Sequence, residues 1–220
     1  MSLEIAPRHH PPETVLSVDP VWTELRAEAE QAATTEPALA GLIWTTILSR
    51  SSLEEAVAYR FCSRLASADL PADAIRDLFE RAAAADPSIT AAIRQDLRAV
   101  RERDAACERF LEPVLHFKGF HALQAHRLTH WLWHGGRRDF ALLLQSRASE
   151  VFQTDIHPAA RFGAGLFLDH ATGLVVGETV VIEDDVSMLQ NVTLGGSGHE
   201  RTDRHPKIRH GVLILSLIHI

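Results

Sequence analysis

Residues 156–194 read IHPAARFGAGLFLDHATGLVVGETVVIEDDVSMLQNVTL, and a large apolar residue stands at every sixth position. A period of six fits neither an amphipathic helix nor an alternating strand. It is typical of a solenoid with three short flat faces per coil, because each face then sends one aliphatic residue into a shared core. The sequence therefore predicts a β-helix over this stretch. The residues of the ladder are Ile156, Phe162, Leu168, Leu174, Val180, Val186 and Val192.

The ladder is interrupted once, after Val192. Its next two positions hold Gly198 and Arg204, and the register resumes at Ile208, Ile214 and Ile220. We therefore interpret residues 195–207, which are polar and glycine-rich, as a loop extruded from the coil, where function is commonly found. The chain then ends in LSLIHI after Ile214. Six mostly apolar residues without a corner glycine do not complete a coil, so we expect the β-helix to be incomplete at its C-terminus.

The sequence before residue 153 carries helical patterns instead. Residues 1–18 are rich in proline and histidine and are expected to form a disordered tail. An all-helical domain is predicted over 19–152, followed by the β-helix over 153–220, which gives an α+β fold class. The helix start and break signals are Asp19-Pro20, Pro37, the alternative capping boxes Ser51 with Glu54 and Ser52 with Glu55, Pro71, Asp86-Pro87 and Gly135-Gly136.

Composition excludes several classes of partner. The net charge of −7 and the pI of about 6.0 provide no basic field for nucleic acid or anionic lipid. No apolar run approaches the roughly 20 residues that span a bilayer, and the N-terminus lacks the pattern of a secretory signal. Cys62 and Cys107 lie in helical patterns and are interpreted as buried small hydrophobes. We expect a cytoplasmic protein that binds neither nucleic acid nor membrane.

Aspartate and histidine are concentrated where the coil begins, at Asp155, His157, Asp169 and His170. A carboxylate beside an imidazole is what a general base needs, because the acid orients the ring and stabilises its charged form. A polar corner without a role is an equally weighted alternative for Asp169-His170. Coils of about 18 residues place Asp155 and His170 on adjacent coils, as neighbours that need not share a hydrogen bond.

A metal site is not favoured, because the histidines of the C-terminal region show no paired spacing typical of metal ligands. The candidate ligands are His157, His170, His199 and His205.

Five motifs make most of the chain, from about Val21 to Ile214, resemble the serine O-acetyltransferase family. They are KGFHALQAHRLTHWLW, DIHPAA, LDHATGLVVGETVVIEDDVS, QNVTLGG and DRHPKIR. The resemblance implies a helical N-terminal assembly domain, a left-handed parallel β-helix, and trimers or dimers of trimers. It also implies acetyl transfer from acetyl-CoA to L-serine in cysteine biosynthesis, with acetyl-CoA as co-substrate and no tightly bound cofactor. The family's tail binds O-acetylserine sulfhydrylase, and L-cysteine inhibits at the serine site.

The resemblance also assigns roles to individual residues. His170 would be the general base and Asp155 its orienting carboxylate. Asp104, Asp169, Arg204 and His205 would bind serine, in a site between neighbouring subunits. Gly196 and Ser197 would lie near the CoA thiol. Ala105 stands where the family often has proline, which makes the turn after Asp104 a point to check.

Two alternatives to an active enzyme remain open at this stage. One is a truncated, catalytically impaired fragment that acts only as an oligomerisation or interaction module. The other is a hexad-repeat acyltransferase for a sugar or an amine, against which DHATG and DRHPK argue together. Consumption of acetyl-CoA in the presence of serine would distinguish the enzyme from the fragment.

Overall fold

The computed structural model describes residues 19–196 and 202–216 of the chain. Several sequence predictions lie outside these described residues: the disordered tail over 1–18, the CoA contact of Ser197, the candidate ligand His199 and the ladder position Ile220.

The N-terminal part is helical to residue 152. Asp19 caps the first helix by accepting hydrogen bonds from the backbone N–H groups of Val21 and Trp22. Of the two alternative capping boxes, the Ser52 hydroxyl accepts from the backbone N–H of Glu55, whose carboxylate accepts from the backbone N–H of Ser51. The α-helices are α1 (Pro20–Thr35), α2 (Ala40–Ile43), α3 (Leu53–Leu65), α4 (Ala72–Ala85), α5 (Pro87–Arg103), α6 (Leu111–Leu115), α7 (Lys118–His134) and α8 (Arg138–Phe152).

The helix predicted to start at Pro37 is not a continuous α-helix. It consists of a 3₁₀ turn, η1 (Pro37–Leu39), then α2, then a π-helical segment, η2 (Trp44–Leu48). The hydroxyl of Thr45 donates to the carbonyl of Gly41, and the Arg50 guanidinium donates to the carbonyl of Thr45. Side-chain hydrogen bonds of this kind compete with the backbone bonds of an α-helix. The spacing of apolar residues carries no information about them and therefore did not reveal the change of helix type.

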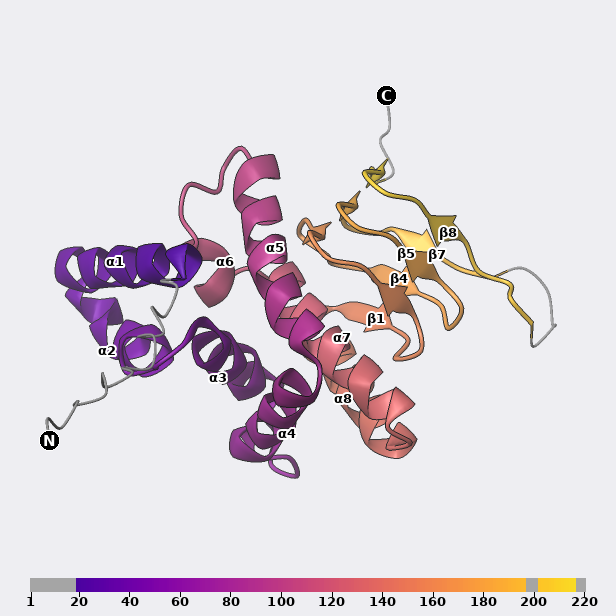
Figure 1. Cartoon of the computed structure of the whole chain (residues 1–220), viewed down its shortest axis with the longest axis horizontal. Coiled ribbons are helices and arrows are strands. Elements are labelled where there is room, and N and C mark those ends of the chain that lie inside the picture. Colours follow the sequence, from indigo (N-terminus) through magenta and orange to yellow (C-terminus); the bar gives the residue numbers. More distant parts are fainter. Residues whose placement is uncertain (1–18, 197–201, 217–220) are drawn as a thin grey trace, which may run out of the picture.

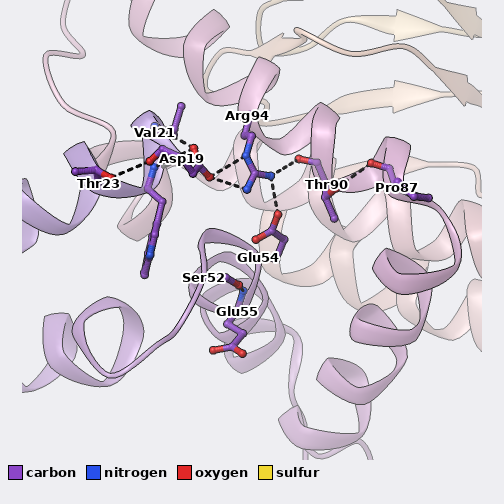
Figure 2. Close-up of polar contacts among 10 residues, drawn as sticks. Asp19, Val21, Thr23, Ser52, Glu54, Glu55, Pro87, Thr90 and Arg94 are labelled. Atoms are coloured by element: carbon purple, nitrogen blue, oxygen red, sulfur yellow. Dashed lines mark hydrogen bonds and ion pairs between the residues drawn. The ribbon is translucent and has the colours of Figure 1, made fainter. Parts of the chain in front are cut away.

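Arg94 of α5 ties three helices together, as Figure 2 shows. Its guanidinium donates to the Asp19 carboxylate at 2.6 Å and to the Glu54 carboxylate at 2.6 Å. It also donates to the carbonyl of Thr90, one turn earlier in α5. The cap of α1 and the first turn of α3 are thereby fixed to the helix that leads into the candidate site.

The strands form three parallel three-stranded sheets with the orders β1-β4-β7, β2-β5-β8 and β3-β6-β9. Successive strands thus lie on successive faces of a three-sided coil, as the six-residue ladder predicts. In Figure 1 the coil lies at one end of the molecule, with α5, α7 and α8 nearest to it. The strands are β1 (Thr154–Ile156), β2 (Arg161–Phe162), β3 (Phe167–Leu168), β4 (Leu174–Val176), β5 (Val181–Ile182), β6 (Ser187–Met188), β7 (Thr193–Leu194), β8 (Lys207–Ile208) and β9 (Leu213–Ile214).

The pairing register corrects the expected coil length. Leu168 pairs with Met188, a step of 20 residues, whereas Val176 pairs with Leu194, a step of 18. The prediction of about 18 residues per coil is therefore wrong for the first coil. The two additional residues lie in the corner between β3 and β4. The extruded loop accounts for a third step, of 26 residues, from Val181 to Lys207.

Each part of the chain has its own hydrophobic core. Six of the ladder residues are buried in the core of the coil: Ile156, Leu168, Leu174, Val180, Val186 and Val192. The other ladder residues that the structure describes with apolar side chains, Phe162, Ile208 and Ile214, are partly buried against this core. Cys62 is buried in the larger helical core, and Cys107 is buried beside Val100 and Phe167. Across the described ranges 19–196 and 202–216, no helix has the length and apolar character needed to cross a membrane.

Acid is expected to destabilise the fold through the buried His121. Arg64 only donates, so His121 Nδ1 accepts from it at 2.7 Å and Nε2–H donates to the Val114 carbonyl at 2.8 Å. Burial lowers the pKa of His121 to about 3, so the neutral ring is favoured in the folded state. The resulting stability is present above an unfolded pKa of about 6.5 and is lost as pH falls toward 3.

Urea unfolding at two pH values measures this effect. Between pH 6.5 and pH 5, His121 should contribute a loss of about 2 kcal/mol in the free energy of unfolding. His121→Asn should be less stable at pH 6.5 but should lose correspondingly less on acidification. Equal losses in both proteins would contradict the assignment.

Candidate functional site

A cavity of about 610 Å³ opens at the corner between β3 and β4. It brings together three sequence-predicted residues, Asp104, Asp169 and His170. The first comes from the end of α5 and the other two from the corner, so the site lies where the helices meet the coil. The other lining residues are Ala106, His116, Phe117, Lys118, Gly119, Phe167, Leu168 and Thr172.

The corner that carries His170 has an unusual backbone. His170 and Ala171 both have left-handed conformations, with φ of 55° and 59°, and Gly173 has φ of 73°. Consecutive non-glycine residues with positive φ are costly and persist where the surroundings hold them in place. The two additional residues of the first coil lie in this corner, so the strained backbone displays His170 at the cavity.

The His170 ring is available for chemistry. Its side chain is 70% exposed, and its Nε2 lies 3.7 Å from the Asp169 carboxylate. This is an ion-pair distance for a protonated ring rather than a hydrogen bond. The described part of the chain contains no hydrogen bond to this ring. An exposed imidazole beside a carboxylate fits a general base that acts on a bound hydroxyl.

Asp104 is held in place by the turn that follows α5. Its side chain accepts a hydrogen bond from the backbone N–H of Ala106 at 2.9 Å, and its carbonyl accepts from Cys107 N–H at 3.0 Å. The turn therefore closes with Ala105 in place of the proline often found in the family. The preceding Arg103 donates to the carbonyls of Gly165 and Asp185, which anchors the end of α5 to the coil.

Arg204 and His205, which precede β8, contact a different corner of the coil, the one between β4 and β5. His205 Nδ1 is 2.8 Å from the Thr179 hydroxyl, and Arg204 donates to Glu178 at 3.1 Å. The His205 ring lies directly over Gly177, where a Cβ atom would be 2.0 Å from Nε2. Desolvation, followed by the Arg204 charge, lowers the pKa of His205 and favours its neutral form. Gly196 also belongs to this corner, since a Cβ there would be 2.9 Å from Arg204 Cγ.

Asp155 lies in β1, and its side chain is hydrogen-bonded to a residue of α8. Its carboxylate accepts from Gln145 Nε2 at 2.7 Å. Among the described residues, no hydrogen bond or ion pair joins it to His170. Asp155 pairs with Val175 in β4, the strand that follows the His170 corner. His170 therefore lies at the end of the coil that Asp155 begins, and the prediction that the two lie on adjacent coils is wrong. The orienting role of Asp155 stays a prediction.

Sequence reasoning missed the contribution of α7 to the cavity. Lys118 and Gly119 begin that helix and line the cavity in contact with the corner. A Cβ atom at Gly119 would lie 2.0 Å from the Leu168 carbonyl oxygen, so only glycine allows this approach of helix to strand. One feature of the sequence could have revealed this contact. Glycine has a low helix propensity, so Gly119 at the second position of a helix indicates a close approach to another segment.

The chemistry of the cavity is that of acids and imidazoles. Over residues 19–196 and 202–216, no three His, Cys, Asp or Glu side chains are grouped to hold a metal ion. Both cysteines are poor nucleophiles, because burial raises the pKa of Cys62 and also that of Cys107, the latter to about 12. The ionisable groups that line the cavity are the imidazoles of His170 and His116, the carboxylates of Asp104 and Asp169, and the ammonium group of Lys118.

The chain is similar to known serine acetyltransferases in both sequence and structure. Residues 21–125 match the family model described as serine acetyltransferase, N-terminal. The serine acetyltransferase of Salmonella typhimurium is 54% identical over 194 residues, which are 88% of this chain and 71% of the relative.

Two solved structures are similar over most of this chain. The serine acetyltransferase of Brucella abortus in complex with coenzyme A is 58% identical, with a TM-score of 0.88 over 89% of this chain and 78% of its own. The soybean serine acetyltransferase complexed with serine is 52% identical, with a TM-score of 0.85 over 88% of this chain and 79% of its own.

Proposed function

This chain belongs to the serine acetyltransferase family, and we propose that it transfers the acetyl group of acetyl-CoA to the hydroxyl of L-serine. The products are O-acetylserine, an intermediate of cysteine biosynthesis, and free CoA. One observation carries the proposal: a strained corner displays His170 in a cavity shared with Asp104 and Asp169. The relatives' complexes with coenzyme A and with serine support both substrates.

His170 acts as the general base. A serine hydroxyl is a poor nucleophile near neutral pH, and a positioned imidazole that removes its proton accelerates attack by about 10²–10⁴-fold. The serine oxygen bonds to the thioester carbon, and the carbon–sulfur bond then breaks. The proton taken up by the imidazole passes to the departing CoA thiolate. Because both cysteines are buried and protonated, direct transfer is favoured over an acyl-enzyme.

Serine binding requires groups of both charges. Asp169 and Asp104 provide carboxylates for the ammonium group, and the cavity wall already holds both. The serine carboxylate needs cationic or N–H donors, for which Arg204 and His205 are the candidates. These two residues do not line the same cavity in one chain.

We therefore place the active site between two copies of the chain. The corner with Asp104, Asp169 and His170 of one copy meets the corner with Arg204 and His205 of the next. A closed trimer of left-handed β-helices repeats this contact three times, and dimers of trimers would form through the helical region 19–152. In this arrangement Asp155 orients His170 through the carboxylate oxygen that Gln145 does not occupy, and the loop with Gly196 and Ser197 approaches the thioester.

Mixing two inactive variants tests the shared site. His170→Ala and His205→Ala remove opposite halves, so each protein alone should lack transferase activity. When the two are mixed as unfolded chains and refolded together, about a quarter of the sites in random trimers have both halves intact. Serine-dependent acetyl transfer should therefore recover to about a quarter of the wild-type level.

The matched control mixes His170→Ala with Asp169→Ala, which damage the same half and should give no recovery. Native mass spectrometry establishes that mixed trimers have formed. Mixed trimers of the first pair that remain inactive would show that the two corners do not build one site.

A further inference from the structure

We propose that Lys118 is a positioning residue for His170, because its ammonium group clamps the corner that displays the catalytic ring. The effect of the clamp on catalysis rests on the proposed function, but the clamp itself is a property of the fold. Three observations support it: Lys118 contacts the corner, the corner depends on hydrogen bonds from other segments, and the start of α7 is fixed against the same corner.

The contacts of Lys118 join three segments of the chain. Lys118 is the first residue of α7. Its Nζ donates to Gln153 Oε1 at 2.8 Å and also to the hydroxyl of Thr172. Gln153 ends α8, and Thr172 lies two residues after His170. One ammonium group therefore connects the start of a helix, the junction of helices and coil, and the catalytic corner.

The corner needs this support because its own backbone is strained. Two local hydrogen bonds close the corner, from Ala171 N–H to the Asp169 carbonyl and from Leu174 N–H to the Ala171 carbonyl. Further anchors come from other parts of the chain. Asn191 N–H donates to the Thr172 carbonyl at 2.7 Å, and Gly173 N–H donates to the Gln153 carbonyl at 2.9 Å. Gln153 thus holds Gly173 through its backbone and Lys118 through its side chain. Loss of Lys118 would release both the Thr172 hydroxyl and the Gln153 side chain.

The start of α7 also contacts the chain just before the corner, at the end of β3. Gly119 lies against the Leu168 carbonyl so closely that a Cβ atom would be 2.0 Å away. Leu168 immediately precedes Asp169, so adjacent residues of α7 contact the corner before and after His170. Among the residues described as lining the cavity, Lys118 is the one lysine or arginine. Its ammonium group donates hydrogen bonds within the protein, and partial burial lowers its pKa.

Two substitutions remove the clamp from its two ends. Lys118→Met keeps the length of the side chain but removes the donor, and Thr172→Val keeps the shape but removes the acceptor. Thr172 is exposed, so Thr172→Val should fold even if Lys118→Met does not. Thr172→Ser restores the hydroxyl. The matched controls are Arg98→Met, which removes an exposed cation of α5, and Thr34→Val, which removes an exposed hydroxyl on α1.

Amide hydrogen exchange of the full chain measures the clamp without reference to catalysis. The Gly173 and Ala171 amides should exchange about tenfold faster in Lys118→Met and in Thr172→Val, because each loses a charge-assisted hydrogen bond. The double variant should exchange no faster than Lys118→Met, and Thr172→Ser should restore protection. The controls should leave these amides unchanged.

Serine kinetics add the functional readout. The kcat should fall about tenfold in both variants with little change in KM for serine, because the ring is misplaced while the carboxylates remain. Exchange less than threefold faster in both single variants, or effects that add in the double variant, would overturn the proposal. A clamp confirmed by exchange in a protein that does not acetylate serine would instead refute the proposed function.

Discussion

Replacing His170 with alanine is expected to lower kcat for serine acetylation by about 10²–10⁴-fold, the range supplied by a positioned general base. The ring is exposed in the cavity, and no hydrogen bond within the described residues ties it to the fold. Its removal should therefore leave the stability of the protein almost unchanged. Initial rates of CoA release with saturating acetyl-CoA and serine, together with a urea unfolding curve, measure both effects.

His210→Ala is the matched control for this substitution. His210 is an exposed histidine of the coil, 3.7 Å from Asp185, and does not line the cavity. It should retain wild-type kcat. A His170→Ala protein with near-normal turnover would refute the assignment of the base, and His116 or the carboxylates of the cavity would then have to account for catalysis.

Replacing Asp96 with alanine is expected to lower the free energy of unfolding by about 3–5 kcal/mol, the usual cost of removing one partner of a buried ion pair. Asp96 is fully buried, and its Oδ2 accepts from the Arg127 guanidinium at 2.7 Å. Its Oδ1 accepts from Leu166 N–H at 3.0 Å, and Arg127 also donates to the Gly163 carbonyl. The pair therefore fastens α5 and α7 to the corner before β3, and its loss leaves a guanidinium buried without its counter-ion.

Urea unfolding followed by tryptophan fluorescence measures the loss. Glu24→Ala, which removes an exposed partner of Arg101, is the control and should cost less than about 1 kcal/mol. Replacing both Asp96 and Arg127 by leucine should recover much of the stability, because no unpaired charge remains buried. A loss below about 1 kcal/mol for Asp96→Ala would show that the pair does not hold the two parts together.

The three-sided coil could be predicted from the sequence because every face must bury aliphatic residues at a fixed interval. Its exact register could not. Leu168 and Leu174 are six residues apart, yet two additional residues separate the strands at that corner. Each strand pair buries two alternate positions, such as Leu174 and Val176 in β4. Leu168 is equivalent to the later of these positions and Leu174 is the earlier one, so the six-residue interval is kept although the corner is two residues longer. The spacing of apolar residues therefore does not reveal the two additional residues. They lie in the corner that carries His170.

The candidate site was predicted in part. Asp104, Asp169 and His170 meet in one cavity although 65 residues separate the first two in sequence, and the family motifs supplied that association. Lys118 and Gly119 were not singled out, because their roles depend on tertiary contacts with Thr172 and Leu168. The sequence also did not reveal that the candidate site residues lie at two different corners of the coil. Arg204 and His205 were assigned to a loop, and only the folded coil shows which corner that loop contacts.

The central claim is that this chain moves an acetyl group from a thioester to the hydroxyl of serine. Its most direct test is the release of CoA thiol from acetyl-CoA by the purified, folded protein, with and without L-serine. We expect release that requires serine and matches O-acetylserine formation one to one. A folded, assembled protein that releases no thiol above the buffer rate when serine is added would contradict the claim and favour a role in assembly alone.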